Sequence, residues 1–127
     1  MLDLIIKNGS CYIDKDLKDQ DIAIKDGKII KIGKIDNEAK EVFDAKGLTV
    51  LPGCIDTQTH FREPGSTDTE DLHSGSRAAI VGGITSVFEM PNTNPPTSTK
   101  VEFQKKLDLA KNRMYCNYAF YFGATAD

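Results

Sequence analysis

The sequence has little of what marks a membrane, secreted or nucleic-acid-binding protein. No apolar run approaches the ~20 residues that a membrane-spanning helix needs. The start, MLDLIIKNGS, is too short and too lightly charged for a secretory signal. The sequence has 16 Lys and Arg against 19 Asp and Glu, and the basic residues do not form a cluster. Nucleic-acid binding therefore has no electrostatic support. We therefore expect a protein that binds neither a membrane nor nucleic acid.

Cysteine and histidine are also scarce. Cys11, Cys54 and Cys116 are odd in number and lack CxxC spacing, which favours free thiols in a reducing cytoplasm. The only histidines are His60 and His73. The 127 residues, with 39% hydrophobic and 28% charged side chains, indicate an ordinary globular chain of about one domain.

The first part of the chain has the patterns of β-strands. Residues 2 to 32 predict short strands with a turn at Asn8-Gly9. Asp26-Gly27 lies between two alternating segments and predicts a tight hairpin. The β character continues to Pro52. We predict a small β-sandwich over residues 1–51, without a plausible catalytic cluster.

After Pro52 the pattern changes to strands that alternate with helices. Strands are predicted over 54–61, 84–90 and 115–124. Thr67 and Glu70 have the spacing of a capping box before the first helix, which Gly82-Gly83 ends.

Thr99 and Glu102 repeat the capping spacing before the second helix. A buried stripe of that helix is predicted at Phe103, Leu107, Ala110 and Met114. The resulting βαβαβ order implies parallel strands with right-handed crossovers. Three such strands with two helices leave an open edge and an uncovered face. We therefore expect residues 52–127 to be the start of a larger (β/α) barrel, usually about 250 residues; the chain is a fragment or needs a partner.

The candidate site lies on the first strand of this second part. Side chains alternate along a strand, so Asp56, Gln58, His60 and Arg62 are predicted to share one face. On a barrel strand that face points inward and its last residues reach the carboxyl-terminal mouth. A histidine there can bind a divalent metal, and an arginine can hold a carboxylate. Asn92, after the second strand, is predicted at the same mouth.

Three segments resemble the dihydroorotases of the amidohydrolase superfamily. They are PGCIDTQTHFREPG, GGITSVFEMPNTNPP and the terminal YFGAT. The hairpin region resembles the amino-terminal β-sandwich of that superfamily, so the resemblance covers essentially the whole chain. It implies reversible closure of N-carbamoyl-L-aspartate to L-dihydroorotate in pyrimidine synthesis, with zinc-activated hydroxide as the nucleophile in the hydrolytic direction.

The resemblance also implies roles for individual residues. His60 matches the second histidine of the metal motif, and Arg62 and Asn92 match residues that bind the substrate carboxylate. Relatives that hydrolyse hydantoins or dihydropyrimidines usually lack the arginine, so Arg62 favours the dihydroorotase branch. No catalytic residue is expected within this chain, because the proton-shuttling aspartate and the other metal ligands lie beyond residue 127 in the family pattern. The 127-residue chain alone is expected to be inactive.

Gln58 departs from the family pattern, which has histidine there. An amide oxygen is a weaker zinc ligand than imidazole. The site therefore keeps one zinc rather than two, or the protein is a non-catalytic relative. Such relatives are structural partners of aspartate carbamoyltransferase. A related cyclic amidase such as allantoinase is a further alternative for the function. Among partners, a homodimer is a further alternative.

Structural roles compete with these site roles. Arg62 can form a surface salt bridge with Glu63 or Asp68, and Asn92 can cap its loop. Asp56 either orients His60 or has a structural role at the strand start. His73 is expected on the surface of the first helix.

Overall fold

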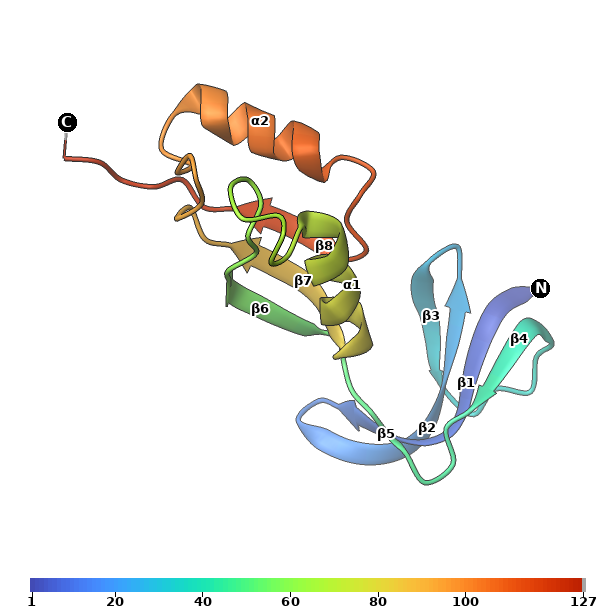
Figure 1. Ribbon diagram of the computed structural model, residues 1–127. Helices are drawn as coiled ribbons and strands as arrows, with labels where there is room; N and C mark the ends of the chain where they lie inside the picture. The colour runs from blue at the N-terminus through green and yellow to red at the C-terminus, as the bar shows by residue number, and fades with distance from the viewer. Residues whose placement is uncertain (127) are drawn as a thin grey trace. The chain divides into compact units, whose positions relative to one another are not determined.

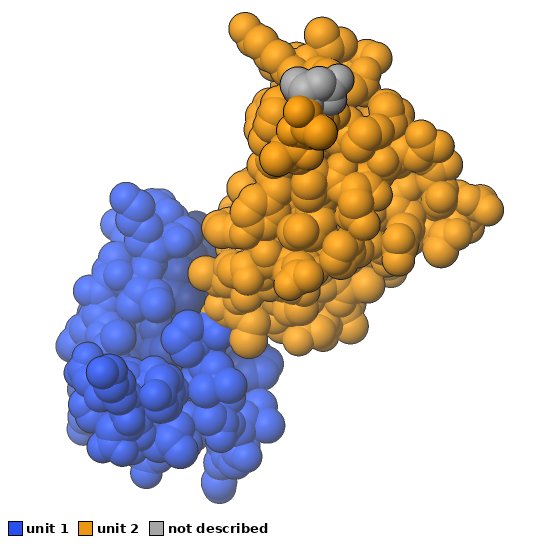
Figure 2. Space-filling view, turned by 90° about the vertical axis from the view of Figure 1, so that its left-hand side faces the viewer, with its two compact units in different colours: residues 1–52 blue, residues 53–127 orange. Residues whose placement is uncertain are grey.

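The computed structural model describes residues 1–126. The chain divides into two compact units, one over residues 1–52 and one from residue 53 onward (Figures 1 and 2). Each unit has its own hydrophobic core. The division falls at Pro52, where the sequence pattern changes from strands alone to strands that alternate with helices.

The first unit is a five-stranded sheet. Its strands are β1 (Leu2–Ile13), β2 (Asp16–Lys25), β3 (Lys28–Gly33), β4 (Ala39–Asp44) and β5 (Thr49–Val50). The order is β3-β2-β1-β4, and β5 also pairs with β1. The β1–β2 and β2–β3 pairs are antiparallel, whereas β4 and β5 run parallel to β1. Ile5, Ala23 and Ile35 form the core of this unit.

One of the two predicted turns in this unit is confirmed and the other is wrong. Asp26 and Gly27 join β2 to β3 with φ angles of 52° and 71°, as a two-residue hairpin requires. Asn8-Gly9 does not end a strand: β1 continues through it to Ile13, and the register with β2 shifts between Ile6 and Gly9. An Asn-Gly pair suits a bulge as well as a turn, because both use a positive φ, here 61° at Asn8.

The second unit is a three-stranded parallel sheet with two helices. In chain order its elements are β6 (Cys54–Thr59), α1 (Leu72–Val81), β7 (Ile84–Glu89), α2 (Lys100–Ala110) and β8 (Asn117–Phe120). The strand order is β6-β7-β8 (Figure 1). The predicted βαβαβ arrangement of parallel strands is therefore present.

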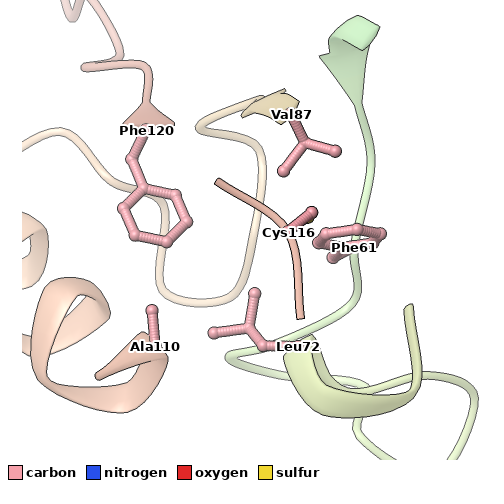
Figure 3. Packing of buried hydrophobic residues seen from close by; sticks show 6 residues of the cluster. All are labelled: Phe61, Leu72, Val87, Ala110, Cys116 and Phe120. Atoms are coloured by element: carbon pink, nitrogen blue, oxygen red, sulfur yellow. The ribbon is translucent and has the colours of Figure 1, made fainter. Parts of the chain in front are cut away.

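Both helices pack on one face of this sheet. Leu72 of α1 and Ala110 of α2 meet Val87 of β7 and Phe120 of β8 in a single core, together with Phe61 and Cys116 (Figure 3). Phe88 lies between the helix-facing side chains of Val87 and Glu89, so it points to the opposite face. There it stacks edge-to-face on Tyr121, and both rings remain partly exposed. The uncovered face predicted from the sequence is thus present and carries exposed aromatic rings.

The caps of α1 differ from the prediction. Asp71, rather than Thr67, is the N-cap: its side chain accepts from the Ser74 amide at 2.6 Å, and Ser74 Oγ accepts from the Asp71 amide at 3.1 Å. The hydrogen bonds from Ser74 hold the pKa of Asp71 below its usual range. Thr67 instead lies in a turn, and Glu70 in the segment between that turn and the helix. Serine can take the place of glutamate in a reciprocal cap, and the T-x-x-E pattern does not include that case.

The other helix boundaries largely follow the sequence. Gly82 caps α1, and Thr99 caps α2 by accepting from the Glu102 amide at 3.1 Å. Phe103, Leu107 and Ala110 pack on the core, but α2 ends at Ala110, so Met114 contacts the core from the following loop. The third strand is shorter than the predicted 115–124. Within residues 1–126, neither helix has the length and apolar character to cross a bilayer.

Candidate functional site

The strand that carries the candidate metal motif ends earlier than predicted. β6 stops at Thr59, so Gln58 is on the strand while His60 and Arg62 begin the loop after it. The chain leaves the sheet here because Phe61 turns into the core beneath the helices. Gln58 and His60 are both exposed on either side of the half-buried Thr59. The prediction of one continuous strand face from residue 56 to 62 is therefore wrong at its carboxyl end.

His60 and Asn92 meet at the carboxyl ends of neighbouring parallel strands. His60 Nδ1 lies 3.0 Å from Asn92 Oδ1. Since an amide oxygen only accepts, Nδ1 carries the proton in this contact, and Nε2 of a neutral ring is left with a free lone pair. The structure thus brings together two of the residues that the sequence placed at the mouth.

Arg62 is exposed, and no ion pair or hydrogen bond of its guanidinium is present among residues 1–126. The predicted alternative, a salt bridge to Glu63 or Asp68, is not formed. Glu63 points instead into the unit and pairs with Arg113. The guanidinium of Arg62 is therefore available to an anionic group at the mouth.

An open depression lies beside Gln58. Its volume is about 490 Å³, within the range of small-molecule sites. It is lined by Thr57, Gln58, Met90, Pro91, Tyr121, Phe122, Gly123 and Ala124. These residues come from the carboxyl-terminal part of β6 and from the segments that follow β7 and β8. His60 and Asn92 are not among them, so the depression and the His60–Asn92 contact are separate features of the same edge.

A buried ion pair fixes the loop that carries Arg62. Both guanidinium nitrogens of Arg113 contact the carboxylate of Glu63, at 2.8 and 3.0 Å. The same carboxylate accepts from the backbone amide of Leu72 at 2.9 Å, at the amino end of α1. The pairing with Glu63 raises the pKa of Arg113 further above its already high value. The loop after β6, the amino end of α1 and the segment after α2 are thereby joined at one charge cluster.

A second buried ion pair joins the end of β7 to α2. Glu89 and Lys106 form a direct contact, and their side chains are essentially inaccessible to solvent. Burial raises the pKa of Glu89 to about 7, against the opposing effect of Lys106. Neither Glu63–Arg113 nor Glu89–Lys106 was predicted. Lys106 follows Phe103 by three residues and therefore lies on the buried stripe of α2, which is a signal that the sequence did contain.

The buried carboxyl of Glu89 predicts a pH dependence of stability. Its folded pKa of about 7 lies above the ordinary 4.5, so the folded state binds this proton more tightly than the unfolded chain. The stabilising contribution is complete below about pH 4.5 and is lost as the pH rises through about 7. We expect the unfolding free energy of the wild type, minus that of Glu89→Gln, to fall over this window with a slope of at most ~1.4 kcal/mol per pH unit.

Urea unfolding followed by far-ultraviolet circular dichroism at several pH values measures this difference. Subtracting the variant removes the contribution of the titrating groups that do not contact Glu89. A difference that stays flat across the window contradicts the raised pKa.

The donor set fits a zinc ion only in part. Nε2 of His60 is a suitable nitrogen ligand, and its Nδ1–H is oriented by Asn92 as ligating histidines commonly are. Gln58 offers a weaker amide oxygen. Within residues 1–126, no group of three or more His, Cys, Asp and Glu side chains has the arrangement of a metal site. The described residues therefore supply one strong ligand and not a complete zinc site, for which about three protein ligands are needed.

Two other residues have structural contacts. Asp56 Oδ1 accepts from the backbone amide of Gln58 at 2.9 Å, and no contact of Asp56 with His60 is found in the described part of the chain. His73 is exposed on α1, and its Nε2 lies 3.2 Å from the hydroxyl of Tyr115. Asp56 thus has a backbone partner on β6, and His73 is a surface residue as predicted.

Comparison with known sequences places this arrangement in a family. Residues 49–126 match the model of the Amidohydrolase family. An allantoinase of Escherichia coli O1:K1 is 46% identical over 113 residues, which are 88% of this chain and 25% of that protein. An allantoinase of Escherichia coli O139:H28 matches with the same identity and coverage. The chain thus spans about a quarter of the length of the curated relatives it matches.

Solved structures agree with this placement. The L-hydantoinase (dihydropyrimidinase) of Arthrobacter aurescens has a TM-score of 0.89 at 35% identity, over 99% of this chain and 29% of that one. An N-acyl-D-glutamate deacylase of Bordetella bronchiseptica, complexed with zinc, shares the fold at a TM-score of 0.66 and 21% identity, over 96% of this chain and 29% of that one. The predicted architecture, a β-sandwich followed by the start of a barrel, is confirmed. The relatives are allantoinases and hydantoinases, so the dihydroorotase branch is not shown.

Proposed function

Because this chain belongs to the amidohydrolase family, we propose that the protein hydrolyses the ring amide of a small cyclic ureide of the allantoin or hydantoin type. The observation that supports this most is the His60–Asn92 contact at the carboxyl ends of β6 and β7. In a barrel, this edge is where catalysis takes place. The identity to allantoinases supports a ureide ring over the ring of dihydroorotate.

The exposed residues of this edge have complementary roles in the proposal. Asn92 accepts from His60 through Oδ1, which leaves its amide N–H groups free to donate to a ring carbonyl. Arg62 contributes a positive charge that attracts and orients a polarised carbonyl or a carboxylate. Gln58 adds a second amide beside the depression. Together these groups bind a flat ring that has several carbonyl and N–H groups.

Zinc is the cofactor that we propose for the complete site. His60 would hold the zinc through Nε2, and the amide oxygen of Gln58 would be a weaker ligand. The further ligands would come from the remaining strands of the barrel. When bound, zinc lowers the pKa of a water molecule and so supplies hydroxide at neutral pH. The contribution of this chain is to present Nε2 with a fixed tautomer, because Asn92 holds the proton on Nδ1.

A substrate with a carboxylate is a second candidate, and Arg62 is the observation that favours it. An exposed guanidinium without an internal partner at the mouth suits an anionic substrate such as L-dihydroorotate. Gln58 favours a third candidate, a non-catalytic scaffold that binds aspartate carbamoyltransferase. A single experiment separates the three.

We expect the protein that contains the remaining strands of the barrel, supplied with zinc, to hydrolyse allantoin or hydantoin faster than L-dihydroorotate. Arg62→Met should then change kcat/KM for the neutral ring by less than about threefold. A neutral ring carries no formal charge with which the guanidinium could pair. If the true substrate carries a carboxylate, the same variant should raise KM by about 10- to 100-fold, because a charged hydrogen bond to the substrate is lost.

Arg77→Met is the matched control, since Arg77 is an exposed arginine on α1 outside this edge. His60→Ala should abolish turnover in either case. A folded, zinc-supplied protein that turns over none of the three substrates contradicts the hydrolase proposal and supports the scaffold.

A further inference from the structure

Lys106 lies beneath the loop that carries Asn92. This loop, residues 90–99, connects β7 to α2, and the buried side chain of Lys106 reaches it from α2. The ammonium nitrogen lies 3.3 Å from the backbone oxygen of Met90, 3.4 Å from Thr93 Oγ1 and 3.2 Å from Thr97 Oγ1. Its contacts therefore span the loop on both sides of Asn92.

The buried ammonium also contacts a carboxyl group and an aromatic ring. Glu89, the last residue of β7, contacts it directly. The ring of Phe120 lies below it, with the nitrogen 5.2 Å from the ring centroid, which adds a cation–π attraction. A lysine has three N–H donors, and here four oxygen-bearing groups surround them, so the ammonium has no hydrogen-bonding capacity left for solvent.

The same loop is also held by the loop after β6. The amide of Asn94 donates to the backbone oxygen of Pro64 at 3.1 Å. Gly65 has a φ of 123°, and a Cβ placed on it would lie 2.8 Å from the Cβ of Asn94. Asn92 therefore lies in a loop that is anchored both by the ammonium of Lys106 and by residues 64–65.

We infer that Lys106, paired with Glu89, is a positioning residue that holds Asn92 against His60 and so fixes the Nδ1–H tautomer of His60. The ammonium neither reaches the mouth nor touches His60; it acts by fixing the backbone and hydroxyls on both sides of Asn92. Its importance for hydrolysis rests on the proposed function, whereas its effect on the His60–Asn92 contact does not.

The test uses the full chain and reads the tautomer of His60 from the nitrogen chemical shifts of its ring. Asn92→Ala removes the acceptor and sets the reference for a ring without it. We expect Lys106→Met to lower the ratio of the Nδ1–H to the Nε2–H tautomer by about 2- to 10-fold, as Asn92→Ala does. This fold-change corresponds to the free energy of one hydrogen bond. Lys105→Met, which breaks an exposed pair with Glu102 on the same helix, should leave the ratio unchanged.

A folded Lys106→Met chain whose tautomer ratio equals that of the wild type overturns the inference. If the helical circular dichroism of Lys106→Met is lost, Thr97→Val decides instead, because it removes one oxygen contact of Lys106 with little change in volume. A reduced ratio in Thr97→Val supports the inference, and an unchanged ratio overturns it. Because the tautomer is measured without substrate, a protein that fails to hydrolyse any ureide still gives a clear result.

Discussion

Arg113→Met is expected to lower the free energy of unfolding of the second unit by about 3 kcal/mol, the lower part of the range for breaking a buried ion pair. The substitution leaves Glu63, which is 6% exposed, with an unpaired carboxylate in the interior. Arg113 itself is 35% exposed, so solvent reduces the penalty and the upper part of the range is not expected. Arg113→Lys should lose less, because a lysine keeps the charge but not both contacts with Glu63.

Both helices belong to the second unit, so urea unfolding followed by the helical circular dichroism signal reports on that unit alone. Lys105→Met is the matched control, because its exposed pair with Glu102 is worth about 0.5 kcal/mol or less. An Arg113→Met chain no less stable than this control means that the charge cluster around Glu63 does not hold the loop of Arg62 in place.

Gln58→His is expected to tighten zinc binding by about 10- to 100-fold in a protein that contains the remaining strands of the barrel. Gln58 and His60 are two residues apart at the end of β6 and are both exposed at its mouth. The substitution replaces an amide oxygen with an imidazole nitrogen, which zinc prefers. Adding His60→Ala should remove the gain, because one imidazole is again missing.

Zinc titration against a chromogenic chelator, on the wild type, Gln58→His and the double variant, measures this affinity. His73→Ala is a suitable control, since that exposed histidine lies on α1 and not at the strand end. Unchanged affinity in Gln58→His, with the other ligands demonstrably in place, means that this strand end does not face a metal.

The features that the sequence predicted correctly depend on local or repeating patterns. The Asp26-Gly27 hairpin depends on two adjacent residues, and the parallel sheet depends on the alternation of strands and helices. The meeting of His60 and Asn92 follows from that alternation as well, because neighbouring parallel strands bring their carboxyl ends to one edge.

The features that the sequence did not reveal depend on long-range pairing. Glu63 and Arg113 are 50 residues apart, and nothing near either of them marks the other as its partner. Glu63 also lies next to Arg62, which made a local surface pair the simpler expectation. The end of β6 was missed for a similar reason: Phe61 fits the strand pattern, but the core beneath the helices offers it a buried position.

The close approach of Gly65 to Asn94 has a consequence for engineering this edge. Any side chain at residue 65 would be strained at a φ of 123° and would collide with the backbone of Asn94. A loop after β6 that lacks glycine at residue 65 therefore cannot be introduced next to the present loop after β7. A graft that places a side chain at residue 65 has to transfer both loops together.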